Sequence, residues 1–255
     1  MHIGTLTGLM RYEPGIDSFR VTKMLFEGRE VKPHVTSVTE LRSGELLVAT
    51  SGRGVFQLNE DGNAYPAEGI NVPSIYLNTV FEDSAGFIWI GSENDGLFRV
   101  DRRTGRMVIY NAPDKITSDK ISDITEDRDG NIFVGTISGG VVRWQPESDR
   151  FVPVPTDGNG TPDIGSMFTD ATGRVYVGTD GDGLKTYDPG RGILESVELA
   201  SAYFDAAKGK IHSILRDRDQ NLWLGYFQKG VLFVPSSENN FTYYGYRSPN
   251  HNIIG

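Results

Sequence analysis

The stretch FEDSAGFIWIGSENDGLFRVD, residues 81–101, places a tryptophan, an acidic cluster and several glycine and aspartate turn signals within twenty-one residues. Taken alone, it suits either a ligand site or a β-hairpin. A second stretch, EDRDGNIFVGTISGGVVRW at residues 126–144, repeats the same order: an acidic residue, a turn glycine, a hydrophobic run ending in glycine, and a further glycine before a strand. The fold therefore depends on how often this order recurs.

The order recurs at a nearly constant interval along the whole chain. The small residue that ends each hydrophobic run, here called the anchor, is Gly4, Ala49, Gly91, Gly135, Gly178 and Gly225. The spacings of 45, 42, 44, 43 and 47 residues are close to the ~40–50 residues of one propeller blade. They predict an all-β propeller of about six four-stranded antiparallel blades. The alternative is an excised part of a seven-bladed or double propeller.

Other positions keep their character relative to the anchor, which marks them as scaffold. A turn glycine stands five residues before it, except for Gln220, and a large apolar residue stands two before it: Leu47, Trp89, Phe133, Tyr176 and Trp223. A second glycine follows five residues after it: Gly54, Gly96, Gly140, Gly183 and Gly230. Trp89 and Trp223 are therefore predicted to be core residues and not sugar-stacking platforms.

An acidic residue stands eight positions before the anchor in four copies, at Asp83, Asp127, Asp170 and Asp217. The surrounding sequences resemble pieces of calcium loops. An EF-hand needs a bidentate glutamate at position twelve, and position twelve counted from Asp127 is Ser138. We therefore expect these aspartates to cap their own hairpins.

The two ends of the chain predict how the array is completed. Residues 2–5 correspond to the second strand of a blade whose first strand is missing, and residues 251–255 resemble such a first strand. If the two pair, residues 1–255 form a single domain without exposed strand edges. Residues 201–210 are the one helix candidate, and a short one.

The composition limits which classes of partner and which kinds of chemistry are expected. The chain has 25 basic and 34 acidic residues and no basic run, so nucleic acid is not expected. It has no cysteine, which excludes disulfides, cysteine-ligated zinc and thiol catalysis. No signal peptide is visible at the N-terminus, and no apolar run reaches the ~18 residues that would span a bilayer. We expect no membrane contact by this chain itself.

At residues 81–101 and 126–144 the chain resembles the two-component regulator propeller repeat, whose consensus runs through an acidic pair, a Gly-Asn turn, Ile-Trp-Ile-Gly-Thr and Gly-Gly-Leu. The resemblance extends from His2 to about Tyr244. In that family the repeats build the periplasmic sensor region of hybrid two-component systems, many from Bacteroides-like bacteria, which detect breakdown products of polysaccharides. The resemblance implies a periplasmic sensor module, an oligosaccharide or other small polar ligand, and a homodimer as one option for the full-length receptor.

The loops after the second strand of each blade vary from copy to copy, unlike the scaffold. In propellers such loops gather on one face, and sugars are bound by aromatic faces together with planar polar groups. The predicted ligand-binding residues are Arg53, Asn94, Asp180, Tyr226, Phe227 and Gln228. No catalytic residue, metal ligand or cofactor is predicted, because the four histidines lack the spacing of metal ligands.

An enzyme is not predicted. General acid–base catalysis needs one distinctive pair of carboxylates, whereas similar carboxylates recur here from blade to blade. The sequence therefore favours a module that senses a ligand without chemistry. A protein–protein interaction propeller is the first alternative, and a propeller-fold carbohydrate-active enzyme is the second.

Overall fold

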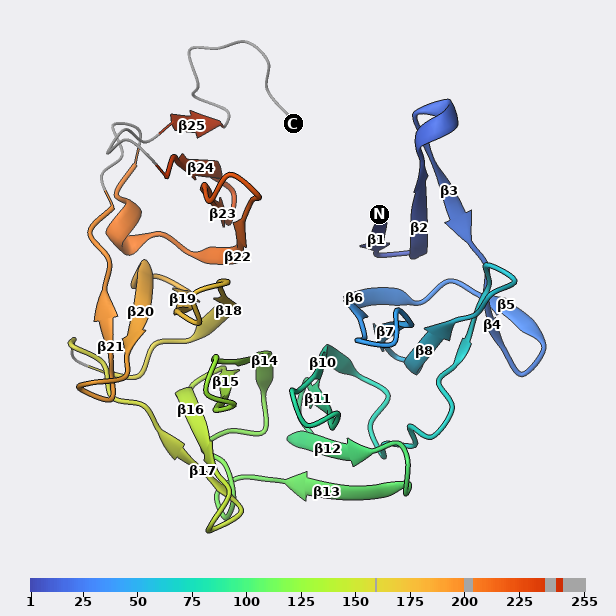
Figure 1. Ribbon diagram of the computed structural model, residues 1–255, viewed down its shortest axis with the longest axis horizontal. Coiled ribbons are helices and arrows are strands. Elements are labelled where there is room, and N and C mark those ends of the chain that lie inside the picture. Colours follow the sequence, from blue (N-terminus) through green and yellow to red (C-terminus); the bar gives the residue numbers. More distant parts are fainter. Residues whose placement is uncertain (159, 200–203, 237–241, 245–255) are drawn as a thin grey trace. The chain divides into compact units, whose positions relative to one another are not determined.

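The computed structural model describes residues 1–158, 160–199, 204–236 and 242–244 (Figure 1). Two compact units make up the chain, Met1–Ile124 and Thr125–Gly255. The chain is an all-β propeller of six blades, each a separate sheet. The strands of each blade pair antiparallel in sequence order, and in blade 2 the added strand β4 (Met24–Phe26) pairs parallel with β9 (Ala64–Pro66). The two helices among the described residues, η1 and η2, are three-residue 3₁₀ turns, and neither could cross a membrane.

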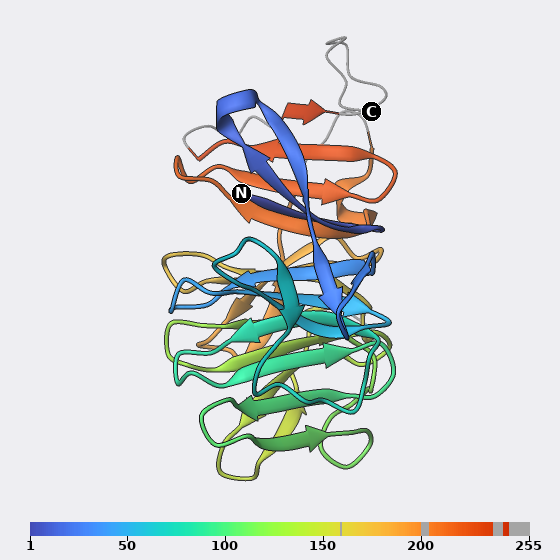
Figure 2. The ribbon, with the colours of Figure 1, turned by 90° about the vertical axis from the view of Figure 1, so that its right-hand side faces the viewer.

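The first unit contains three blades. Blade 1 consists of β1 (His2–Thr5), β2 (Gly8–Glu13) and β3 (Ser18–Thr22), with η1 (Pro14–Ile16) between β2 and β3. Blade 2 consists of β6 (His34–Glu40), β7 (Leu46–Ser51), β8 (Gly54–Leu58) and β9 (Ala64–Pro66). Blade 3 consists of β10 (Leu77–Glu82), β11 (Ile88–Ser92), β12 (Leu97–Asp101) and β13 (Arg106–Tyr110). Figure 2 shows β12 and β13 running in opposite directions, as the register requires.

The second unit repeats the four-stranded pattern. Blade 4 consists of β14 (Ile121–Glu126), which contains the boundary between the units, β15 (Ile132–Thr136), β16 (Gly140–Gln145) and β17 (Arg150–Pro153). Blade 5 consists of β18 (Ile164–Thr169), β19 (Val175–Thr179), β20 (Leu184–Asp188) and β21 (Ile193–Ser196). Blade 6 consists of β22 (Ile211–Arg216), β23 (Leu222–Tyr226), β24 (Gly230–Val234) and β25 (Thr242–Tyr244), preceded by η2 (Ala206–Lys208).

Among the described residues, blade 1 has three strands. Its strand β1 carries the anchor Gly4, which the sequence assigns to the second strand of a blade. The strand expected at residues 251–255 lies outside the described residues. The structure adds a hairpin that the repeat did not indicate: β4 (Met24–Phe26) and β5 (Arg29–Val31) extend the outer edge of blade 2. Of the helix candidate at residues 201–210, the described part, residues 204–210, contains the 3₁₀ turn η2.

The anchor is small because the next blade lies directly against it. A Cβ atom added to Gly91 would be 2.5 Å from Ile121 Cγ2, and one added to Gly178 would be 2.6 Å from Ile211 Cγ2. Ile121 and Ile211 each belong to the first strand of the following blade. The strands that carry these two anchors, β11 and β19, are buried at every position.

The recurring aspartates cap the turn between the first and second strands. The Asp83 carboxylate accepts hydrogen bonds from the backbone N–H groups of Ala85 (3.0 Å) and Phe87 (2.8 Å) and from the Trp89 indole N–H (2.7 Å). Asp217 has the equivalent bond from Trp223, 2.8 Å long. These carboxylates therefore serve the hairpins, as the sequence predicts, and both indoles belong to the scaffold.

Candidate functional site

A buried hydroxyl braces the loop between the second and third strands in four blades. Each of these hydroxyls follows the anchor and donates a hydrogen bond to the carbonyl oxygen four residues later. The pairs are Thr50–Gly54 (2.7 Å), Ser92–Gly96, Thr136–Gly140 and Thr179–Gly183 (2.8 Å each). Between the brace residue and this glycine, the loops expose three of the six predicted ligand residues: Arg53, Asn94 and Asp180.

Tyr226, which the sequence analysis also predicted as a ligand residue, occupies the brace position in blade 6. Its side chain is buried, with 4% exposed, and its hydroxyl lies 3.3 Å from the carbonyl oxygen of Ala206. Its ring meets the edge of Phe204 at 4.7 Å. Burial raises the pKa of Tyr226 well above its ordinary value. Tyr226 is a packing residue, because the position after the anchor faces inward in every blade whose brace is described.

In the first unit, two loops attach to one two-residue segment. The Gly52 N–H donates to the Ile75 carbonyl oxygen (2.7 Å), and the Glu93 N–H donates to the Tyr76 carbonyl oxygen (3.0 Å). Ile75 and Tyr76 are 50% and 51% exposed. The loops of Arg53 and Asn94 thus flank an exposed tyrosine that the sequence analysis missed. We call Arg53, Tyr76, Glu93 and Asn94 the Tyr76 surface.

In the second unit, Lys210 links the predicted residues of two blades. Its Nζ atom is 2.6 Å from Asp180 Oδ1, and its carbonyl oxygen accepts a hydrogen bond from the Phe227 N–H at 2.9 Å. The Phe227 ring, 48% exposed, stacks on His212 with centroids 5.1 Å apart. We call Asp180, Lys210, His212, Phe227 and Gln228 the Lys210 surface.

The sequence analysis also missed Lys210 and His212, although the sequence contains a signal for this region. Tyr76 and Lys210 each stand immediately before the first buried residue of a first strand, Leu77 and Ile211. The residue types there change from blade to blade as the loop residues do. Five of the six predicted residues therefore divide between two surfaces, and the sixth, Tyr226, is buried.

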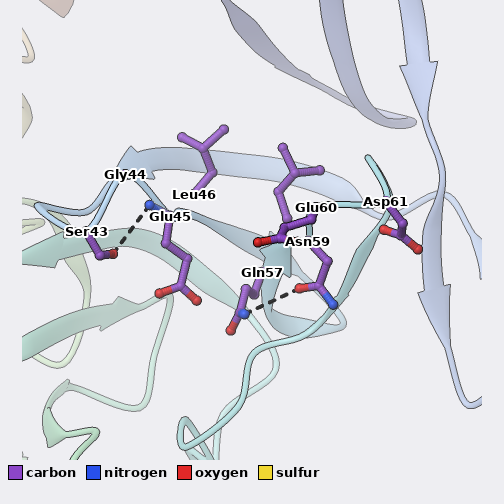
Figure 3. A pocket seen from close by; sticks show the side chains of 9 residues that line it. Ser43, Gly44, Glu45, Leu46, Gln57, Asn59, Glu60 and Asp61 are labelled. Carbon is purple, nitrogen blue, oxygen red and sulfur yellow. Dashed lines mark hydrogen bonds between the residues drawn. The ribbon is translucent and has the colours of Figure 1, made fainter.

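A hollow with a volume of about 800 Å³ lies at the other end of blade 2, beside its turns. Figure 3 shows Glu45, Gln57, Asn59 and Asp61 around it, with a hydrogen bond of 3.3 Å from Gln57 Nε2 to Asn59 Oδ1. Glu45 is paired with Arg102 at 2.9 Å. The hydroxyl of Tyr65, then the side chain of Asn63, lowers the pKa of Asp61. The carboxylates of Glu45 and Asp61 thus already have hydrogen-bonding or ion-pair partners within the protein.

No group of three or more acidic, histidine or cysteine side chains suited to a metal ion occurs among the residues that the structure describes. What the two surfaces offer is an exposed aromatic ring beside charged and amide groups. Such a combination can bind a polar ligand through stacking and hydrogen bonds.

The repeat has a family counterpart. Residues 69–94 and 115–138 match the two component regulator propeller family, so the chain carries the repeat of that family. Each matched stretch runs from the segment before a first strand to the loop after a second strand, and thus includes Tyr76 in blade 3.

The chain is also similar to larger proteins. It is 24% identical over 195 residues to "Histidine kinase P4" of Formosa agariphila, covering 68% of this chain and 13% of that protein. Two extracellular domains from B. thetaiotaomicron, described as belonging to the hybrid two component systems BT3049 and BT4673, have TM-scores of 0.76 and 0.79. Their identities are 17% and 20%, and the match covers 96% and 99% of this chain but 33% and 32% of theirs. The chain spans a third or less of these proteins.

Propeller enzymes share the fold as well. Virginiamycin B lyase from Staphylococcus aureus has a TM-score of 0.65 at 15% identity, and the match covers 85% of this chain and 71% of the lyase. At this identity the likeness concerns the fold alone.

Proposed function

We propose that this propeller is a ligand-sensing module of a two-component receptor, located in the periplasm, and that it binds an oligosaccharide without chemically changing it. The observation that supports this most is the match of two stretches to the two component regulator propeller family. The similarity to extracellular domains of hybrid two component systems agrees with it.

The Lys210 surface is the proposed binding region. A sugar ring presents C–H groups that pack on an aromatic face and hydroxyls that need both donors and acceptors. Phe227 offers an exposed face, while Asp180 and Lys210 offer an acceptor and a donor that are already held 2.6 Å apart. Holding these groups in place before binding reduces the ordering cost of association. Gln228 adds an exposed amide on the same loop.

Signalling requires that the ligand bind two states of the receptor with different affinity. In this proposal the propeller supplies the recognition, and the remainder of the receptor supplies the states. Signalling of this kind requires no chemical reaction within the propeller.

The test is calorimetric titration of the chain with a panel of neutral and acidic oligosaccharides, together with chromatography that detects their cleavage. Binding without cleavage is the expected result. Phe227→Ala is expected to weaken binding about tenfold or more. Phe19→Ala, which removes an exposed aromatic ring from blade 1, is the matched control and should bind as the unchanged chain does. Cleavage of any oligosaccharide would instead favour a carbohydrate-active enzyme.

A further inference from the structure

Lys185 is a charged residue at a position that blades 2, 3, 4 and 6 fill with an apolar side chain. The position is seven residues after the anchor, and its occupants in those blades are Phe56, Phe98, Val142 and Leu232, all at most 1% exposed. In blade 1 the same spacing reaches Arg11, which is exposed. Lys185 is 0% exposed as well. A buried lysine is costly unless it is paired and hydrogen-bonded.

The ammonium group of Lys185 has three partners from three segments. It lies 2.8 Å from Asp182 Oδ2, 3.0 Å from Ser196 Oγ and 3.4 Å from Asp157 Oδ1. Asp157 also accepts the Ser196 backbone N–H at 2.7 Å. That hydrogen bond is the largest favourable influence on Asp157, and with the charge of Lys185 it lowers the pKa of this carboxyl.

One of these partners belongs to the loop that forms the Lys210 surface. The Asp182 N–H donates to the Thr179 brace at 2.9 Å, and Asp180, two residues before Asp182, pairs with Lys210. Lys185 thus holds the end of the loop that presents Asp180. In blade 3 the equivalent Asp95 is held differently, by the hydroxyl of Ser74 at 2.6 Å.

We infer that Lys185 is a positioning residue: through its buried ion pair with Asp182 it sets the conformation of the loop at residues 179–183, and with it the Asp180–Lys210 pair of the binding surface. The effect of this role on ligand binding rests on the proposed function. Stability alone does not explain the lysine, because blades 2, 3, 4 and 6 meet the packing requirement with Phe, Val or Leu. Replacing a buried ion pair by an apolar side chain is often neutral or stabilising.

The deciding variant is Lys185→Leu, which introduces the residue type of Leu232 in blade 6. Asp182 and Asp157 are 55% and 33% exposed at their side chains, so water can solvate them once the lysine is gone. We expect the thermal unfolding midpoint to stay near that of the unchanged chain. Backbone amide hydrogen exchange in residues 179–183, measured by mass spectrometry, should become about tenfold faster or more.

Leu232→Met is the matched control, since it changes the same position of blade 6 without touching an ion pair. It should leave exchange in residues 179–183 unchanged. Unchanged exchange there in Lys185→Leu would overturn the inference. If Lys185→Leu fails to fold, Asp182→Asn decides instead. It leaves Lys185 paired with Asp157, and it must loosen the same loop for the inference to stand.

The consequence in binding is measured separately. With an oligosaccharide that binds the unchanged chain, Lys185→Leu should raise the Kd about tenfold, in keeping with a loop that must be ordered on binding. An unchanged Kd together with a loosened loop would overturn the link to binding. If the unchanged chain binds no oligosaccharide of the panel, the proposed function fails. The exchange experiment still tests whether Lys185 positions the loop.

Discussion

Arg102 of blade 3 holds Glu45 of blade 2 in a two-pronged ion pair, with Nη1 2.9 Å from Oε2 and Nη2 3.2 Å from Oε1. The same guanidinium donates to Gln57 Oε1 at 3.0 Å and to the Glu68 carbonyl oxygen at 3.2 Å. The planar fork of arginine matches a carboxylate in this way, whereas lysine cannot. Within the first unit, one side chain thus connects two blades.

We expect Arg102→Lys to lower the free energy of unfolding by about 1–2 kcal/mol, because it removes the two-pronged geometry and leaves Gln57 and Glu68 without their donor. The side chains of Arg102 and Glu45 are 23% and 24% exposed, which keeps the effect moderate. Urea denaturation measures it. Arg103→Ala is the control, since its side chain is 88% exposed and should change stability by less than about 0.5 kcal/mol. Equal effects of the two variants would contradict this prediction.

Asp83→Ala should be more damaging than its sequence position on a turn suggests. The variant leaves three donors without an acceptor, including the indole N–H of Trp89, whose side chain is fully buried. We expect a loss of about 2–4 kcal/mol in the free energy of unfolding. Asp129→Ala, in the exposed part of the blade 4 hairpin, should cost less than about 0.5 kcal/mol. A loss of that small size for Asp83→Ala would show that the hairpin cap is dispensable.

Gln220→Gly is expected to stabilise the chain by about 0.5–1 kcal/mol. Gln220 has a φ of +67°, in the left-handed region where the equivalent residues Gly44, Gly86, Gly130 and Gly173 also lie. A side chain there costs ~1–2 kcal/mol, and the entropy of glycine offsets part of the gain. The converse change, Gly86→Ala, should destabilise by about 1 kcal/mol through the backbone alone, since nothing lies within 4 Å of the added Cβ. A stability loss in Gln220→Gly would refute the backbone explanation.

The second unit should lose stability in acid. Hydrogen bonds from the Trp223 indole, and next from the Asn221 side chain, hold the pKa of Asp217 below its ordinary value of 3.8. Burial alone would raise the pKa of Asp170, but hydrogen bonds from Thr172 and Arg174 and the charge of Arg216 together lower it. A lowered carboxyl pKa stabilises the fold at pH values above the unfolded pKa. That contribution is lost as the pH falls through the folded pKa.

The stabilisation from these two carboxyls is therefore complete above about pH 5 and declines below pH 3.8. Urea midpoints measured between pH 2 and pH 7 should show this decline. Asp217→Asn cannot titrate at that position, so its midpoint should be lower at neutral pH and should change less with pH. If the urea midpoint of this variant changed with pH as steeply as that of the unchanged chain, Asp217 would not contribute to the loss of stability in acid.

Sequence reasoning predicted the scaffold because its causes are local. The turn glycine at Gly130 has a φ of +81°, and a positive φ is a property of one residue and its immediate neighbours. Trp89 was assigned to the core from its repeated position, and the structure buries it fully. The anchor Gly91 was found as a repeated small residue, and its close approach to Ile121 explains why it is small.

The binding surfaces were predicted less well, because they depend on which loops meet. Asp180 and Phe227 were found as variable loop residues, but their common neighbour Lys210 was not. Tyr226 was predicted as part of an exposed loop, whereas its side chain is buried and packs against Phe204. A repeat shows which positions differ between blades without showing which of them point inward.

By itself, the sequence determined that this chain is a propeller of six blades, since period, strand alternation and turn chemistry are all written within each copy of the repeat. Only the tertiary structure decided that Asp180 pairs with Lys210 and that Lys185 is buried among Asp157, Asp182 and Ser196. The physical reason is that side chains from neighbouring strands, turns and blades meet through packing. The energy of a buried charge depends on those partners, and two partners of Lys185, Asp157 and Ser196, are 28 and 11 residues away along the chain.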